Sequence, residues 1–140
     1  MNLLCALTAG ALCVSPINIP SGATLQGKAQ VYDGDTIYVN SQAVRLWGID
    51  AEELHEPNGH RAKMWLRNII GGKDVVCNRV GNSHNRITAR CAISGVPGSD
   101  LGSSLVGAGL ALDCFRYSNG FYRQAEPPGS RSRLVAKPYC

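Results

Sequence analysis

A small set of carboxylates and arginines has residue types and spacing suited to chemistry on a phosphate ester. Aspartate oxygens are ligands that hard cations such as Ca²⁺ prefer, and a further carboxylate nearby can activate water. Planar guanidinium groups can clamp phosphate oxygens while negative charge builds on them. Together these groups are the components of a metal-assisted attack on a phosphodiester. The candidate residues are Asp33, Asp35, Arg45, Asp50, Glu53 and Arg86.

The segment that would carry the first of these residues predicts an antiparallel meander. Residues 24–39 are typical of a β-hairpin, with Asp33-Gly34-Asp35 as the tight turn and β-branched and aromatic residues on the returning strand. A second polar turn at 40–42 leads into a third strand at 43–49. Asp35 is therefore expected at a hairpin turn, and Arg45 on the strand that follows.

An amphipathic helix is predicted next, over 58–70. Ala62, Trp65, Leu66 and Ile69 recur at helical spacing, and Gly71-Gly72 is a stop signal. Trp65, like Trp47 on the third predicted strand, is expected in the core rather than as a base-stacking platform, because both lie in apolar-patterned segments.

Two more strands and a shorter helix follow. Residues 74–80 and 87–93 are strand-like and are joined by a polar loop at 81–86, and Asp100 is a candidate N-cap for a helix ending near Leu110. After Ala111 the sequence has little periodicity, and Pro127-Pro128-Gly129 excludes a long terminal helix, so an irregular tail that wraps the surface is expected. The order of elements predicts an α+β, mainly β, fold: a five-stranded barrel of the oligonucleotide-binding type with two to three helices, although the pattern alone leaves other α+β folds open.

The composition is that of one domain. A chain of 140 residues, 44% of them hydrophobic, can bury a core of its own. Its net charge of +4 suits a polyanionic partner but does not identify one. No internal repeat, coiled coil or low-complexity block is present.

The N-terminal segment indicates export. Residues 1–23 contain no charged side chain, an apolar run covers 3–14, and Ser21-Gly22-Ala23 supplies small residues for cleavage after Ala23. We therefore predict a signal peptide at 1–23, a domain at 24–140, and a secreted or periplasmic location without stable membrane association. The usual basic residue is missing from the start of the segment, so a buried N-terminal helix or a misplaced start codon stays an alternative.

The cysteines support an oxidising compartment. Removing residues 1–23 leaves four cysteines, an even number, and no Cys-x-x-Cys spacing that would favour zinc. Four cysteines permit three pairings, of which we predict the one that joins Cys77 to Cys91 and Cys114 to Cys140. Cys77 and Cys91 lie on strands expected to be adjacent, and Cys114 and Cys140 bracket the aperiodic tail.

From about Gln26 to Tyr117 the sequence resembles the staphylococcal-nuclease-like (thermonuclease) family. The family pattern comprises an Asp-Gly-Asp-Thr turn, an Arg-Leu-x-x-Ile/Val-Asp-x-Pro-Glu strand end and a Tyr-Gly-Arg loop. This chain has Asp33-Gly34-Asp35-Thr36, then Arg45-Leu46-Trp47-Gly48-Ile49-Asp50-Ala51-Glu52-Glu53, then His84-Asn85-Arg86. The match of several motifs in one order is far more specific than an Asp-Gly-Asp turn alone, which is more often an ordinary hairpin.

The resemblance implies roles for particular residues. Asp35, Asp50 and the carbonyl oxygen of Ala51 would hold Ca²⁺, with Asp33 as a more distant acid. The catalytic residues would be Arg45, Glu53 and Arg86. The implied activity is a calcium-dependent, sugar-nonspecific cleavage of DNA and RNA by a monomer without a protein partner. It would break the P–O5′ bond and leave 3′-phosphorylated products.

The chain departs from the family pattern at two loops. Glu52 replaces the proline before the catalytic glutamate, so that loop loses a fixed φ and gains a charge. His84-Asn85 replaces Tyr-Gly, and Asn tolerates positive φ well enough for the turn to survive. In the family, a lysine and a tyrosine beside this turn often contact a terminal phosphate. In this chain, Ser83 and His84 stand at those two positions. Two nucleotide-contacting tyrosines fall on Phe115 and Tyr117, of which only the second keeps a hydroxyl.

Other interpretations stay open. The chain could be a catalytically inactive barrel that binds nucleic acid or protein, or a lipid- or wall-associated domain. His55, Glu56 and His60 could suggest transition-metal ligands, but their spacing favours solvated loop residues. Four tail arginines could contact a phosphate backbone or only increase solubility: Arg116, Arg123, Arg131 and Arg133.

Overall fold

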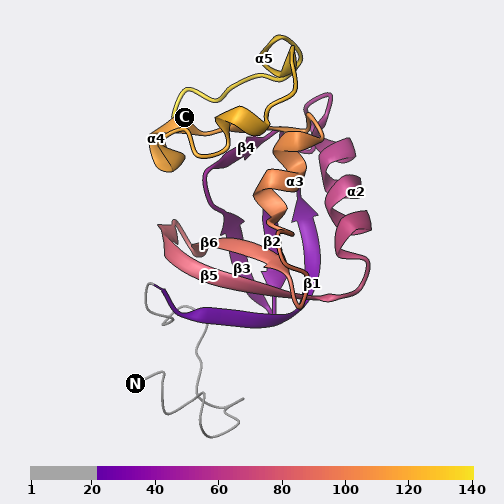
Figure 1. Ribbon diagram of the computed structural model, residues 1–140, viewed down its shortest axis with the longest axis vertical. Helices are drawn as coiled ribbons and strands as arrows, with labels where there is room; N and C mark the ends of the chain where they lie inside the picture. Colours follow the sequence, from indigo (N-terminus) through magenta and orange to yellow (C-terminus); the bar gives the residue numbers. More distant parts are fainter. Residues whose placement is uncertain (1–21) are drawn as a thin grey trace, which may run out of the picture.

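Five strands form a closed barrel in the computed structural model, which describes residues 22–140 (Figure 1). Of the predicted signal peptide at 1–23, residues 1–21 lie outside the described residues. Strand order around the barrel is β1-β2-β3-β6-β5; β3 and β6 run parallel, and every other pair is antiparallel. The predicted OB-like, mainly β fold is confirmed. The barrel strands are β1 (Thr24–Asp33), β2 (Thr36–Val39), β3 (Gln42–Leu46), β5 (Asp74–Ser83) and β6 (Arg86–Ile93).

The barrel interior follows from the alternation of side chains along each strand. In β3, Val44 and Leu46 are buried while Ala43 and Arg45 between them are only half-buried. Because successive strand residues point to opposite faces, the same strand fills the core and presents an arginine outside it. Ile37, Val39 and Val75 contribute to the same core from neighbouring strands.

Two helices pack beside the barrel. Helix α2 (Gly59–Ile70) buries Ala62, Leu66 and Ile70, and it ends where Gly71 adopts a left-handed φ of 56°. The expectation that Trp65 lies in the core is wrong, because its position at the edge of this apolar stripe leaves it 40% exposed. Helix α3 (Leu101–Gly107) starts as predicted. The carboxylate of Asp100 accepts a hydrogen bond from the Ser103 amide at 3.0 Å.

A second, two-stranded sheet was not anticipated by the sequence pattern. The expected third strand at 43–49 is interrupted after Leu46, where Gly48 takes a φ of 76° and the chain turns away from the barrel. The residues that follow form β4 (Ile49–Ala51), which pairs with β7 (Ala111–Asp113). This pairing moves Asp50 off the barrel and brings it close to the C-terminal part of the chain.

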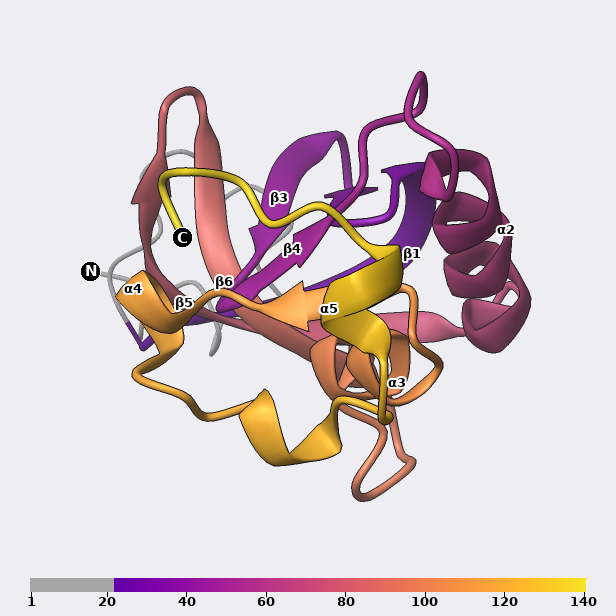
Figure 2. The same ribbon diagram turned by 90° about the horizontal axis from the view of Figure 1, so that it is seen from above.

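The tail is largely irregular, as predicted, and contains three short helical turns. They are α4 (Phe115–Ser118), η2 (Arg123–Ala125) and α5 (Ser130–Arg133). Both predicted disulfides are present: Cys77 with Cys91, and Cys114 with Cys140. After α5 the chain crosses over β4 and ends beside α4 (Figure 2). Within residues 22–140, no helix combines the length and apolar character needed to span a membrane.

Candidate functional site

The Asp-Gly-Asp turn is held against both β4 and α2. A Cβ atom on Gly34 would lie 2.7 Å from the Cβ atoms of Ala51 and Ala62, so a larger residue would push the turn away from both. Inside the turn, the Asp35 amide donates to Asp33 Oδ1 at 3.1 Å. Glycine is therefore required here for close packing, which fixes both buried aspartates next to β4.

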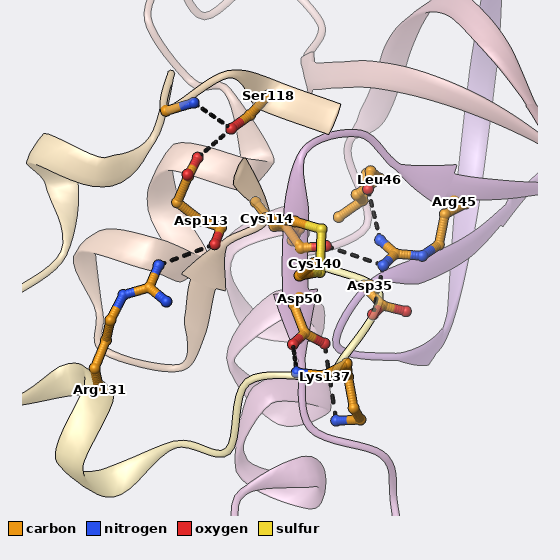
Figure 3. Close-up of a disulfide and its surroundings, with 12 residues drawn as sticks. Asp35, Arg45, Leu46, Asp50, Asp113, Cys114, Ser118, Arg131, Lys137 and Cys140 are labelled. Atoms are coloured by element: carbon orange, nitrogen blue, oxygen red, sulfur yellow. Dashed lines mark hydrogen bonds and ion pairs between the residues drawn. A yellow bond between two sulfur atoms is a disulfide. The ribbon is translucent and has the colours of Figure 1, made fainter. Parts of the chain in front are cut away.

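Arg45 is fixed by three partners. Its Nη1 donates to the Leu46 carbonyl at 2.7 Å and its Nη2 to the Ile49 carbonyl at 2.9 Å. Its Nη2 also lies 3.4 Å from Asp35 Oδ2 in an ion pair whose side chains are 12% and 6% exposed (Figure 3). The bonds to carbonyls at the break between β3 and β4 orient the guanidinium toward the acidic turn.

Arg86 reaches the same turn from the opposite strand. It begins β6, and its Nη1 donates to Thr36 Oγ1 at 2.9 Å, while its Nη2 lies 3.4 Å from Ser83 Oγ. The hairpin that presents it is a two-residue turn rather than the longer loop predicted. His84, with a φ of 57°, takes the left-handed conformation that we had expected at Asn85. This register lets β5 pair with β6 up to Arg86 itself.

Asp50 faces a lysine from the tail. The Lys137 amide donates to Asp50 Oδ2 at 2.9 Å, and the Lys137 ammonium lies 3.8 Å from Oδ1 (Figure 3). Among the described residues, the buried Oδ1 has no hydrogen-bond partner. Burial raises the pKa of Asp50, and the negative charge of Asp35 adds to the rise, while Lys137 opposes it. Sequence reasoning missed Lys137 because a single lysine in an aperiodic tail carries no signal of this contact.

The loop that bears Glu53 is stabilised by Glu56. The Glu53 amide donates to Glu56 Oε1 at 2.6 Å, and the Glu56 amide donates back to the Glu53 carbonyl at 2.8 Å. The Lys137 ammonium lies 2.9 Å from the same Oε1. This contact lowers the pKa of Glu56, and for Lys137 the bond to Glu56 and the charge of Asp50 outweigh burial and raise its pKa. A Cβ on Gly59 would overlap the Glu53 carbonyl, so glycine is needed where α2 begins.

Glu52 is a structural acid. It is 3% exposed, its Oε1 accepts from the Asn58 amide at 2.8 Å, and its Oε2 accepts from the Val135 amide at 3.2 Å. Both oxygens are thus occupied by backbone donors from the start of α2 and from the tail. Glu52 therefore anchors these segments, and neither of its oxygens is free to act as a base.

Carboxylates are concentrated around the turn. Burial raises the pKa of Asp33 to about 6, and the nearby charges of Asp35 and Glu53 contribute to the rise. Such mutual repulsion creates a demand for positive charge that a cation can meet. Within residues 22–140 no cluster of three or more His, Cys, Asp or Glu side chains is arranged to hold a metal. A bound ion would therefore depend on two carboxylates, a carbonyl and water.

A pocket of about 590 Å³ lies beside the two arginines. Of the predicted substrate contacts, His84 and Tyr117 line it, whereas Phe115 does not and is 59% exposed. Tyr139 from the tail also lines it and was not foreseen. Burial, followed by the charge of Asp50, raises the pKa of the Tyr139 hydroxyl. The wall residues that matter chemically are Arg45, Arg86, His84, Tyr117 and Tyr139.

The remaining candidates have simpler roles. His55 and His60 are exposed, as expected of solvated residues. Trp47 is half-buried, packs against the core and also lines the pocket. Arg131 bonds the carboxylate of Glu126 at 2.7 Å and the Asp113 carbonyl at 3.0 Å, so it serves the tail's own structure.

No model of a protein family matches the chain, and no curated protein matches it.

Proposed function

We propose that this protein is a calcium-dependent, sugar-nonspecific nuclease that hydrolyses phosphodiester bonds of DNA and RNA to 3′-phosphorylated products. The observation that carries the proposal is the convergence of Arg45 and Arg86, from β3 and β6, on one pocket wall beside the acidic turn. Two fixed guanidiniums at a cavity are suited to an oligoanionic ligand.

The chain's own residues have distinct tasks in this proposal. A guanidinium carries five N–H donors, so Arg45 and Arg86 can bind phosphate oxygens while keeping the bonds that orient them. Because those bonds pre-set the geometry, the positive charges need little rearrangement as negative charge builds in the transition state. Glu53 accepts the proton of the attacking water, the P–O5′ bond breaks as the new P–O bond forms, and the departing 5′-oxygen takes a proton from solvent water.

The donor set suits Ca²⁺. Asp35, Asp50 and the carbonyl of Ala51 would hold it. The observation that favours a cation there is the buried Oδ1 of Asp50, which accepts no hydrogen bond from residues 22–140 and has among them only the distant charge of Lys137, 3.8 Å away, beside it. When bound, the ion would act as a Lewis acid on a phosphate oxygen. The two disulfides fit the proposed secreted or periplasmic location.

The rival is an inactive barrel that binds nucleic acid or protein. A pure binder has no need for two arginines at the pocket together with Glu53, whose charge acts on Asp33 of the acidic turn. The test incubates the purified chain with single-stranded DNA and with RNA in excess Ca²⁺, in Mg²⁺ and in excess calcium chelator. We expect cleavage of both substrates in Ca²⁺, little in Mg²⁺ because of its rigid octahedral demand, and none in chelator.

Glu53→Gln is the matched control, because it keeps the size of the side chain and removes the base. End-group analysis should find phosphate on the 3′ ends. Shifted mobility of the nucleic acid without any cleavage would favour the binding module instead, and full turnover in chelator would refute the calcium requirement.

A further inference from the structure

The last seven residues, 134–140, form a strap over β4 and over the Glu53 loop, which is the segment 52–58 between β4 and α2. Three donors from the strap meet three different acids. The Val135 amide bonds Glu52, the Lys137 amide bonds Asp50, and the Lys137 ammonium bonds Glu56. The end of the strap is covalently tied through Cys140 to Cys114, and the Cys140 carbonyl accepts from the Arg116 amide at 3.1 Å.

One oxygen atom links the strap to the Glu53 loop. Glu56 Oε1 accepts from the Glu53 amide at 2.6 Å and from the Lys137 ammonium at 2.9 Å. A Glu side chain has several rotamers of similar energy, and the lysine contact selects the one that also holds the Glu53 amide. The Lys137 and Glu56 side chains are 16% and 21% exposed, so water screens this pair less than it screens a surface ion pair.

Other features of the loop make such a contact effective. Leu54 and His55 are exposed and contribute nothing to the core, so the loop has few apolar contacts of its own. Directly before Glu53, Glu52 is buried and is itself held by hydrogen bonds from the Asn58 and Val135 amides. The backbone of Glu53 is therefore held mainly by polar contacts. One of them is the bond to Glu56, whose carboxylate also binds the Lys137 ammonium of the strap.

We infer that Lys137 is a positioning residue for Glu53: through Glu56 it holds the loop in the geometry that the reaction needs. This inference rests on the proposed nuclease function for its catalytic readout. A displacement of about 1 Å in a catalytic group can cost on the order of 10²-fold in rate, so a small loosening of this loop is measurable.

The test compares Lys137→Met, Lys137→Arg and Lys73→Met with the wild-type chain in Ca²⁺. Met keeps the length of the side chain without a donor, Arg restores the charged donor, and Lys73 is an exposed control after α2. We expect Lys137→Met to lower kcat about tenfold with KM changed less than twofold. Lys137→Arg should recover most of the loss, and Lys73→Met should match the wild type.

A second readout does not depend on activity. Hydrogen exchange of the Glu53 amide should accelerate at least tenfold in Lys137→Met, while the amides of α2 between Leu66 and Ile70 keep their protection. Unchanged kcat with unchanged Glu53 exchange would overturn the inference. A uniform loss of protection across barrel and helix would also overturn it, because it would show a merely structural role.

The two proposals can fail separately. If the wild-type chain cleaves no substrate, the nuclease function fails, and the exchange of the Glu53 amide still decides whether Lys137 holds the loop. If the wild type cleaves and the Lys137→Met chain is indistinguishable from it in both readouts, only the positioning role fails.

Discussion

The two disulfides join regions of very different construction. Cys77 and Cys91 are directly opposite each other on β5 and β6, within an antiparallel ladder that continues on both sides of them. Cys114 and Cys140 tie the strap to the end of β7, and the strap itself belongs to no sheet or helix. The first bond reinforces an interface that backbone hydrogen bonds already define. The second fastens a segment that depends on it and on a few polar contacts.

The candidate site draws on both regions. Its two arginines come from barrel strands, where backbone carbonyls fix Arg45 and side-chain hydroxyls fix Arg86, whereas Lys137 and Tyr139 come from the strap. Residues on rigid elements hold their geometry most closely, so the groups that need the highest precision are expected on the barrel. The strap is suited to supporting roles, which can tolerate a looser attachment.

The largest effect should come from the two arginines on the barrel strands and from Glu53, the proposed base. Arg86→Lys or Glu53→Gln should each lower kcat by on the order of 10²–10⁴, because loss of one preorganised charged group or base commonly costs that much. Neither change should alter the circular dichroism spectrum or the melting temperature greatly. Steady-state kinetics on a short oligonucleotide measures the effect. An unimpaired Glu53→Gln chain would show that the base is another residue.

Removal of each disulfide should destabilise a different region of the molecule. By loop entropy each bond contributes about 3 kcal/mol to the free energy of unfolding. Replacing Cys77 and Cys91 with Ala should lower the stability of the whole barrel, seen as a lower Tm in one cooperative transition.

Replacing Cys114 and Cys140 should act first on the strap. The amides of Val135 and Lys137 should lose protection from hydrogen exchange under conditions where the barrel stays folded. Equal loss of protection in barrel and strap would show that the two regions unfold as one unit.

The charge of Asp33 in the acidic turn should lower the free energy of unfolding as the pH rises. The raised pKa of Asp33 means that its protonated form stabilises the folded chain below about pH 4, and that this stability is lost as pH rises through about 6. Asp33→Asn keeps the acceptor for the Asp35 amide and carries no charge. In chelator, its gain in unfolding free energy over the wild type should grow from pH 4 to pH 7, reaching at most about 3 kcal/mol. A gain that does not vary with pH would contradict this cause.

The smallest effect is expected at the pocket wall. Tyr139→Leu and Tyr117→Leu each remove an aromatic face on which a base could stack, a contact worth about 1 kcal/mol or somewhat more. Each should raise KM a few-fold with kcat nearly unchanged. Because Tyr139 depends on the strap, its contribution should vanish when the Cys114–Cys140 bond is absent, whereas that of Tyr117 should persist. Kinetics of the combined variants measures the difference.

The sequence by itself determined the elements whose signals are local. Strand alternation, the helical spacing of α2, the Asp100 cap and the Asp-Gly-Asp turn each depend on a few neighbouring residues, and the structure contains all of them. The two disulfides could also be predicted, because one pair lies on adjacent strands and the other brackets the aperiodic tail.

Only the tertiary structure decided how the tail completes the site. The contacts of Val135 with Glu52, and of Lys137 with Asp50 and Glu56, join residues 81 to 87 positions apart. They exist because β7 pairs with β4 and the strap then crosses that sheet. No periodicity encodes such a meeting, since it depends on how the whole chain closes. The same reason explains why the role of Glu52 is understood only beside the strap that it binds.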